Sequence, residues 1–251
     1  MKQRMKGGMV VGVGVGPGDP DLLTVKAIRI LQEADVVCAP TPNLAADSVA
    51  LGIVKPVLEG RRSAPEVVPL VFPMVRVEAE LEKAWAENAD RIAKYAQEGK
   101  KVAYVALGDP SLYSTFTYVQ RELRIKYPEI RVEIIPGVTS LSACMAKTQI
   151  PLAFGEETLL IMPSFDSDLL QEQSRLVDNI VWIKGIKKLP EAIKILNESA
   201  RFSDKSQILI AKRCSFSDEE IWRGNVQDAV NLKLPEDYFA MMMVRRMPSD
   251  G

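Results

Sequence analysis

The sequence contains no histidine, and this absence limits the chemistry that the protein can perform. Histidine is the usual general base near neutral pH and the commonest metal ligand, so its absence removes both, together with the Ser-His dyad. We therefore predict no metal site. Any catalysis is expected to use carboxylates, tyrosine, lysine, backbone groups or a cofactor.

Cysteine is also scarce. Cys38, Cys144 and Cys214 are the three cysteines in 251 residues, and their wide spacing fits neither a disulfide framework nor a paired metal-binding motif. A reducing compartment, the cytoplasm, is the expected location.

Neither sign of charge dominates the chain, and no long apolar run interrupts it. The 32 basic and 33 acidic side chains give a formal net charge of −1, so nothing favours nucleic acid or an anionic membrane as a partner. No segment approaches the roughly 18 apolar residues of a membrane-spanning helix. Residues 1–8 are basic but lack the apolar core of a signal peptide, and we expect a disordered leader there.

The sequence from Val10 to Thr24 predicts a strand, a tight turn and the start of a helix. Small and β-branched residues up to Val15 suit a buried strand, and the glycine-rich turn after it leaves its backbone open to a ligand. Pro20 fits the first helical position and Asp19 its cap. This is the opening β-loop-α unit of an α/β fold, in which ligands collect at the carboxyl ends of the strands.

The glycine spacing of this turn does not match a dinucleotide-binding fingerprint. Counted from Gly14, the third glycine falls on Asp19, and counted from Gly12 it falls on Pro17. Asp19 and Asp21 also place negative charge at the helix start, where it would repel a pyrophosphate. The turn favours a ligand without phosphate, the alternative being a turn that serves packing alone.

Two further strand ends carry similar loops. A Gly-Asp-Pro run at residues 108–110 follows a predicted strand, and a Pro-Gly-Val-Thr-Ser run at residues 136–140 follows another. Small residues after Ser140 predict a helix that packs closely on a ligand or on a neighbouring helix, and spacing alone leaves both open.

The whole pattern predicts two α/β domains, at residues 9–120 and 121–251, with a ligand-binding cleft between them. The border is expected between Phe116 and Gly155. Prolines at 56, 65, 69 and 73 break any long element in residues 44–75. The predicted strands are 9–15, 34–39, 67–72, 101–107, 131–135, 158–162, 180–184, 207–211 and 238–245, and residues 220–224 are expected to form a sheet edge or a turn. The predicted helices begin at Pro20 and span 77–98, 112–126, 167–178 and 190–200.

Three motifs in register resemble the tetrapyrrole methylases that use S-adenosylmethionine. They are the run from Val13 to Thr24, the Gly-Asp-Pro run at 108–110 and the Ile-Pro-Gly-Val-Thr-Ser run at 135–140. The likeness extends from Met9 to Arg246. The runs at 108–116 and 140–144 are most similar to the branch that methylates C20 of precorrin-2 or cobalt-factor II.

This resemblance implies a two-domain α/β fold, S-adenosylmethionine in the cleft between the domains, a tetrapyrrole substrate and a homodimer. The apolar run Ala240–Val244 and the first domain are the surfaces expected to be buried between the two copies. Carried over by position, the residues expected to contact the cofactor are Pro17, Leu107, Gly108, Asp109, Leu112, Thr139, Ser140, Lys184, Arg213 and Cys214.

One departure bears on the reaction. Members that methylate C2 and C7 resemble this chain through Ala34–Val37 but continue into an aspartate near the substrate, where this chain has Pro40. A C20 step is therefore favoured over the C2/C7 step. The C11 and C17 steps and a diphthine synthase-like methylation of a protein are the alternatives within the family.

Methyl transfer from a sulfonium is an in-line displacement, so the enzyme mainly has to hold the reacting carbons together and exclude water. If a proton must be removed, Tyr113 and Asp109 are the candidate catalytic residues by position. Basic residues must also face the carboxylates of the tetrapyrrole. The ones considered are Arg61, Arg62, Lys147 and Lys184.

Two other classes of protein fit less well. A nucleotide-dependent oxidoreductase needs a carboxylate at the end of the second strand to bind the ribose, and here Asp35 opens that strand instead. A non-catalytic corrinoid-binding protein would need a ligand for cobalt, and the chain has no histidine to supply one.

Overall fold

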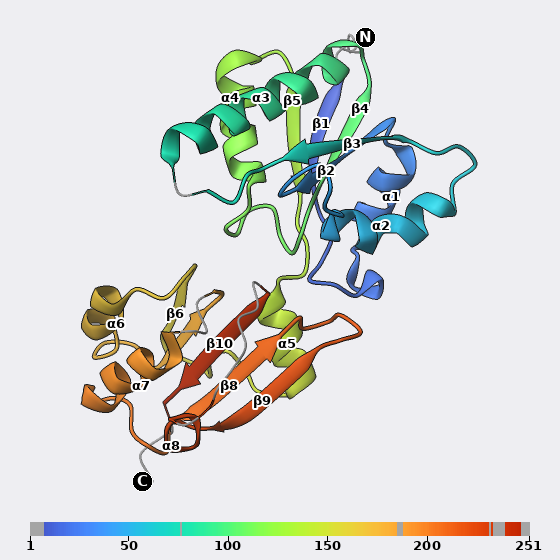
Figure 1. Ribbon diagram of the computed structural model, residues 1–251. Helices are drawn as coiled ribbons and strands as arrows, with labels where there is room; N and C mark the ends of the chain where they lie inside the picture. The colour runs from blue at the N-terminus through green and yellow to red at the C-terminus, as the bar shows by residue number, and fades with distance from the viewer. Residues whose placement is uncertain (1–7, 76, 185–187, 231, 233–238, 247–251) are drawn as a thin grey trace. The chain divides into compact units, whose positions relative to one another are not determined.

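The computed structural model describes residues 8–75, 77–184, 188–230, 232 and 239–246. The chain divides into two compact units, Met1–Ser140 and Leu141–Gly251, each with its own sheet (Figure 1).

The first unit is built on a parallel sheet with the strand order β3-β2-β4-β1-β5. Because every pairing is parallel, all strands end at the same edge, and the loops that follow them lie there together. The strands are β1 (Met9–Gly14), β2 (Val36–Thr41), β3 (Glu66–Val71), β4 (Lys101–Ala106) and β5 (Arg131–Ile135).

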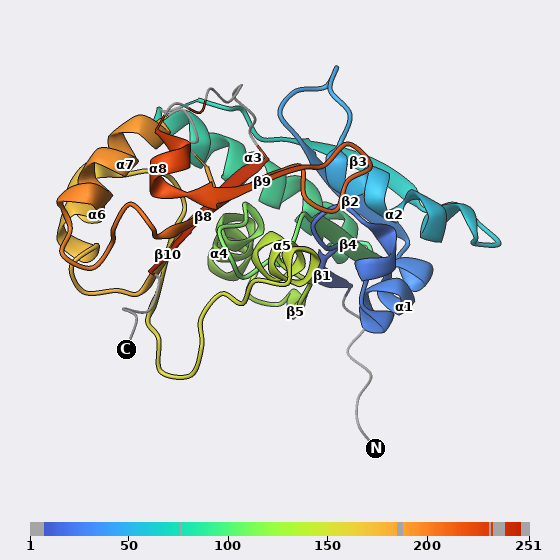
Figure 2. The same ribbon diagram turned by 90° about the horizontal axis from the view of Figure 1, so that it is seen from below.

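Helices cover both faces of this sheet, as the two views in Figures 1 and 2 show. On one face, Val11 and Val13 pack in a core with α1 (Val25–Glu33) and α2 (Val49–Glu59). On the other face, Val10 and Tyr104 pack with α3 (Glu78–Gln97) and α4 (Phe116–Lys126). Alternate strand residues thus enter opposite cores, which explains the almost unbroken apolar strands of the sequence.

The outer strand β3 has a protected edge. Glu66 donates its N–H to the Asp35 carbonyl before β2, and Phe72 donates its N–H to the Thr41 carbonyl at the end of β2. Because backbone groups alternate in direction along a strand, the carbonyls of Val67, Pro69 and Val71 point away from β2. Pro69 has no N–H group, and its carbonyl accepts from the Arg91 side chain at 3.0 Å. The Val71 carbonyl accepts from Asn88 at 2.7 Å. Side chains of α3 therefore occupy part of this edge.

The second unit has a mixed sheet with the order β6-β7-β10-β8-β9. Strand β10 (Ala240–Arg245) is antiparallel to both of its neighbours, β7 (Asn179–Trp182) and β8 (Gln207–Lys212). One face packs Trp182 and other apolar side chains against the helices. The remaining elements are β6 (Leu159–Met162), β9 (Glu220–Asn225), α5 (Ser140–Thr148), α6 (Ser167–Gln173), α7 (Leu189–Glu198) and α8 (Val226–Ala229).

A charged cluster ties together segments at the start of β7. The Asp178 carboxylate accepts from the Thr158 amide at 3.0 Å and hydroxyl at 2.9 Å, and it pairs with Arg201 at 2.8 Å and Arg246 at 3.3 Å. The backbone hydrogen bond from Thr158 is the main cause that holds the pKa of Asp178 below its ordinary value. Ionised Asp178 is therefore an anchor of the second unit.

Three expectations about the first unit need correction. The helix expected from Pro20 is divided into a short 3-10 helix, Pro20–Leu22, and α1, because Thr24 makes a new cap by accepting from the Ala27 amide. Helix α2 runs through Pro56, where a break was expected. Residues 1–7 of the expected leader lie outside the described residues, and Gly8 is buried and donates to the Ala96 carbonyl.

The compact units divide after Ser140, within the expected interval but later than residue 120. The reason is β5, which pairs with β1 in the first sheet. The expected strand at 238–245 is β10, and Tyr238 lies outside the described residues. Because β10 lies between two strands and is buried throughout, the run Ala240–Val244 does not offer a surface to a second copy.

Candidate functional site

Three loops meet at the carboxyl edge of the first sheet. Gly16 and Gly108 form a backbone bridge, in which the Gly108 N–H donates to the Gly16 carbonyl at 2.7 Å. A Cβ atom on Gly14 would lie 2.5 Å from the Gly137 nitrogen and 2.8 Å from the Gly108 carbonyl oxygen. The loops after β1, β4 and β5 therefore approach one another through backbone atoms, which requires glycine.

The Asp109 side chain links two of these loops. Its Oδ2 accepts from the Gly137 N–H at 2.9 Å, and its Oδ1 accepts from the amide of Ser111 at 2.7 Å and from the Ser111 hydroxyl. Partial burial would raise the pKa of Asp109, but these hydrogen bonds outweigh burial and lower it. The contact with Ser111 is the turn that an aspartate before Pro-Ser favours, whereas the link to Gly137, 28 residues along the chain, has no local signal in the sequence.

The loop after β4 is fixed at its far end as well. The buried Tyr104 hydroxyl and the Thr115 hydroxyl are hydrogen-bonded at 2.7 Å. Between the two anchors lies Tyr113, which is 55% exposed and has a left-handed φ of 49°. Such backbone strain in a non-glycine residue is concentrated at functional sites.

The predicted residues of the first unit thus fall on connected loops. They are Pro17 in the first loop, Leu107, Gly108, Asp109, Leu112 and Tyr113 in the second, and Thr139 and Ser140 in the third.

The predicted residues of the second unit also share a sheet edge. Since β7 and β8 are both antiparallel to β10, they run in the same direction, and Lys184 and Arg213 follow their carboxyl ends. Arg213 pairs with Asp218 at 2.7 Å and lies over the Phe216 ring, 4.7 Å from its centroid. Its guanidinium is therefore held by its own loop.

Cys214 is buried in this same loop, and its neighbours Arg213 and Ser215 both have left-handed backbones, with φ of 46° and 73°. Its thiol is hydrogen-bonded to that of Cys144 in α5. This hydrogen bond, together with burial, raises the pKa of the Cys144 thiol. The contact joins α5 to the end of β8.

Two basic residues considered for substrate carboxylates have other partners. The Arg61 guanidinium donates to the Leu31 carbonyl at 2.7 Å, at the end of α1 and far along the chain from the three loops. Lys147 pairs with Glu219 at 2.7 Å. These contacts do not test the expectation that Arg61 and Lys147 face the substrate, which stays a prediction.

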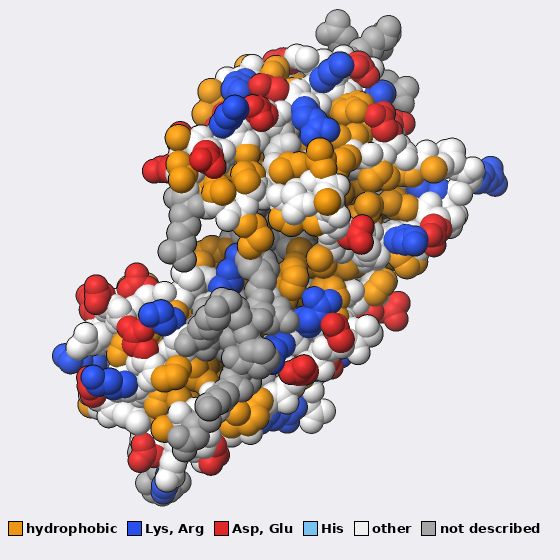
Figure 3. Space-filling view, viewed as in Figure 1, with side chains coloured by type: hydrophobic (Ala, Val, Ile, Leu, Met, Phe, Trp, Pro, Cys, Tyr) orange, Lys and Arg blue, Asp and Glu red, His pale blue; other side chains and the backbone are white. Residues whose placement is uncertain are grey.

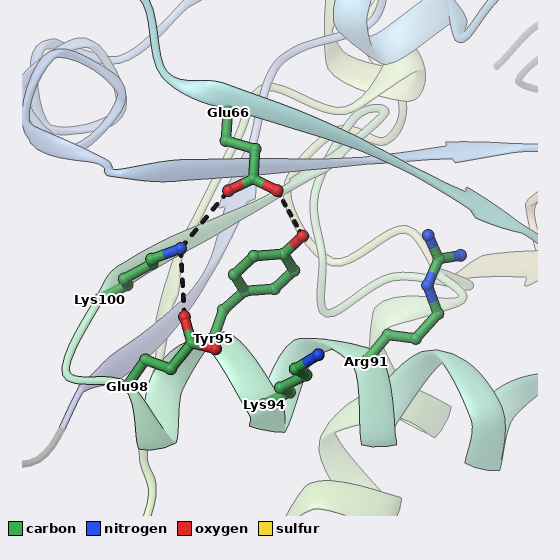
Figure 4. A pocket seen from close by; sticks show the side chains of 6 residues that line it. All are labelled: Glu66, Arg91, Lys94, Tyr95, Glu98 and Lys100. Atoms are coloured by element: carbon green, nitrogen blue, oxygen red, sulfur yellow. Dashed lines mark hydrogen bonds and ion pairs between the residues drawn. The ribbon is translucent and has the colours of Figure 1, made fainter.

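A surface pocket lies at the opposite, amino-terminal edge of the first sheet (Figure 4). There Glu66 accepts from the Tyr95 hydroxyl, and Lys100 pairs with Glu66 at 3.4 Å and with Glu98 at 3.2 Å. Arg91 and Lys94 complete the lining. The lining thus combines three basic with two acidic side chains, and the strand-end loops take no part in it.

The surface shown in Figure 3 has interspersed basic and acidic side chains with apolar groups between them. Among the described residues, no helix combines the length and apolar character needed to cross a membrane.

Comparison with known proteins agrees with this architecture. The family model of tetrapyrrole (corrin/porphyrin) methylases matches residues 9–230. The probable cobalt-precorrin-2 C(20)-methyltransferase of Methanocaldococcus jannaschii is 34% identical over 237 residues, 94% of this chain and 96% of that protein. The precorrin-2 C(20)-methyltransferase of a Sinorhizobium species is 31% identical, covering 94% of this chain and 95% of that protein.

A solved structure shares the fold. It is the uroporphyrin-III C-methyltransferase of Thermus thermophilus in complex with S-adenosylhomocysteine, with a TM-score of 0.66, 24% identity and coverage of 94% of this chain and 92% of that one. The chain belongs to the tetrapyrrole methylase family, and it is a methyltransferase.

Members of this family take the methyl group from S-adenosylmethionine, and the three loops fit such a ligand. They carry Asp19, Asp21 and Asp109 but no lysine or arginine, which suits a cationic sulfonium better than a phosphate. Gly108 has a left-handed φ of 67°, and a Cβ there would meet nothing closer than the Val138 carbonyl at 4.0 Å. Its backbone thus borders open space.

Proposed function

We propose that the protein transfers one methyl group from S-adenosylmethionine to C20 of precorrin-2 or its cobalt-containing form, in the synthesis of the corrin ring of cobalamin. The observation that carries the proposal is the likeness to C20-methyltransferases over nearly the full length of both chains. Pro40 at the end of β2, in place of an aspartate, also disfavours the C2/C7 step.

The chain's own residues bind and orient the reactants. The loops around Pro17, Gly108 and Thr139 would hold the donor by backbone contacts, and Lys184, Arg213 and Cys214 are proposed contacts from the second unit. A reduced tetrapyrrole is itself electron-rich at the meso carbon, so positioning supplies much of the catalysis. If a proton must be removed, Tyr113 is the candidate by position, with its phenolate as the form that takes up the proton, and its strained loop leaves the side chain exposed.

Incubation with carbon-labelled S-adenosylmethionine and either precorrin-2 or cobalt-precorrin-2 tests the proposal. We expect a product heavier by one methyl group, with the labelled carbon attached to the meso bridge in its NMR spectrum. Methylation of uroporphyrinogen III by two groups, or a label on another ring position, would refute the C20 assignment while leaving the family unaffected.

We also propose a homodimer in the cytoplasm. Exposed apolar side chains on α4 and before α3 support the dimer: Met74 is 70% exposed and Ile125 is 69% exposed. Three unpaired cysteines support a reducing location. Light scattering that gives a mass near 27.8 kDa at micromolar concentration would contradict the dimer, and cell fractionation tests the location.

A further inference from the structure

The three strand-end loops are joined by a continuous path of hydrogen bonds that passes through one carboxylate. Gly16 is bridged to Gly108 by backbone groups, and Asp109, the next residue, accepts from the Gly137 N–H. The same carboxylate accepts from Ser111 and so shapes its own loop. A change at Asp109 would therefore alter the relative placement of the loops after β4 and β5.

A second aspartate makes a comparable bridge at the opposite edge of the same sheet. Asp35 accepts from the Lys101 N–H at 2.8 Å, which links the start of β4 to the residue before β2. This bridge lies where the strands begin, away from the three loops. Asp35 and Asp109 make the same kind of hydrogen bond at opposite edges of the sheet, so substituting each in turn shows whether an effect depends on a location at the three loops.

We propose that Asp109 is a positioning residue, whose carboxylate holds the loop after β5 against the loop after β4 so that both backbones form one surface for S-adenosylmethionine. This inference rests on the proposed function, because it takes these loops as the donor site. In this proposal Asp109 positions the loops and does not act as the general base.

The hydrogen bonds argue against proton uptake by this carboxylate. A general base needs a lone pair directed at the proton and a pKa near the operating pH. Oδ1 and Oδ2 of Asp109 accept from Ser111 and Gly137, and these donors hold the pKa of Asp109 below its ordinary value. A carboxylate that stays ionised and is held on both oxygens is suited to anchoring a loop.

The experiment compares Asp109→Asn with the matched control Asp35→Asn in the full chain. Asparagine has one acceptor oxygen instead of two, so either Ser111 or Gly137 loses its partner. Calorimetry with S-adenosylhomocysteine as the probe should show a Kd raised about tenfold or more for Asp109→Asn, the scale of one lost charge-assisted hydrogen bond. Asp35→Asn should bind as the wild type does.

Hydrogen exchange without ligand supplies an independent measurement. The peptide covering residues 136–140 should exchange faster in Asp109→Asn, because the Gly137 amide is the group released, and it should not change in Asp35→Asn. The shape of the pH profile of kcat should be the same as in the wild type, since no proton acceptor is removed.

Unchanged donor affinity in Asp109→Asn, or equal weakening in Asp35→Asn, would overturn the inference. So would a lower kcat at unchanged Kd with loss of the acid limb of the pH profile, which is the signature of a general base. If the wild-type protein itself does not bind S-adenosylhomocysteine, the proposed function fails. If the wild type binds and only the variant behaves contrary to expectation, the positioning role alone fails.

Discussion

Gly12 in β1 lies directly under the ring of Phe116 at the start of α4. A Cβ atom on Gly12 would overlap this ring, coming 2.5 Å from Cδ1. Phe116 is completely buried, and its ring lies 5.0 Å from that of Tyr104, the strand partner of Gly12. The absence of a side chain at residue 12 is thus what lets the helix after the second loop pack against the sheet.

Gly12→Ala should therefore destabilise the protein. Forcing a methyl group into a filled core costs about 1–3 kcal/mol, and urea unfolding followed by circular dichroism should show that loss. The control is Gly52→Ala in α2, where an added Cβ meets nothing within 4 Å. Alanine in that exposed helical position should raise stability by about 0.5–1 kcal/mol. Equal effects of the two substitutions would contradict the packing argument.

Gly108→Ala should weaken donor binding more than it weakens the fold. The left-handed backbone disfavours alanine by roughly 1–2 kcal/mol, and the new methyl group would project into the space beside the loops. Gly99, after α3, is the matched control, with a φ of 85° and nothing within 4 Å of an added Cβ. Both variants should lose similar stability in urea, and only Gly108→Ala should lose affinity for S-adenosylhomocysteine in calorimetry. Equal affinities would exclude Gly108 from the donor site.

Asp178 should make the stability of the second unit depend on pH in the acid range. Its pKa in the folded chain lies below its ordinary value, so its contribution is complete above that ordinary value, about 3.9, and is lost as the pH falls through the folded pKa. Asp178→Asn should cost about 2 kcal/mol at pH 7. In urea titrations from pH 7 to pH 3 it should also flatten the acid decline. The exposed Asp204→Asn is the control, and an unchanged slope in Asp178→Asn would contradict the assignment.

The three thiols should react slowly in the folded protein. All are buried, and burial raises the pKa of Cys38 to about 12. The hydrogen bond with Cys144 lowers the pKa of Cys214, so Cys214 is protected by its burial alone. The thiolate is the reactive form, so a disulfide reagent at pH 7.5 should modify these residues only as the chain unfolds. A cysteine introduced at the exposed Ser203 should react at once under the same conditions. Rapid reaction of a native thiol in the unaltered protein would show that one of these sites opens.

The strand-loop-helix order of the first unit could be predicted because buried parallel strands and glycine turns are local signals. The strands at 101–107 and 131–135 are confirmed by β4 and β5. Proline was a weaker guide. Pro56 lies inside α2, where apolar residues such as Ile53 and Val54 are buried on the sheet and outweigh the lost hydrogen bond.

The site was predictable as a set of loops but not as a set of contacts. Gly108 and Gly137 are turn residues that the sequence identifies directly. The hydrogen bond from Gly137 to Asp109 depends instead on the strand order, which places β5 beside β1. Basic side chains carried even less local information. The hydrogen bond from Arg61 to the Leu31 carbonyl at the end of α1 depends on the fold and has no local signal in the sequence.

The edge of β3 has a bearing on how the protein behaves when concentrated. An open strand edge can recruit the edge of another molecule and seed an intermolecular sheet. Here Pro69 removes one donor from that edge, and the side chains of Arg91 and Asn88 occupy the carbonyls of Pro69 and Val71. Strand addition along β3 would have to displace both side chains and would still lack a hydrogen bond at residue 69. Association of two copies by sheet extension at this edge is therefore disfavoured, and so is the growth of fibrils from it.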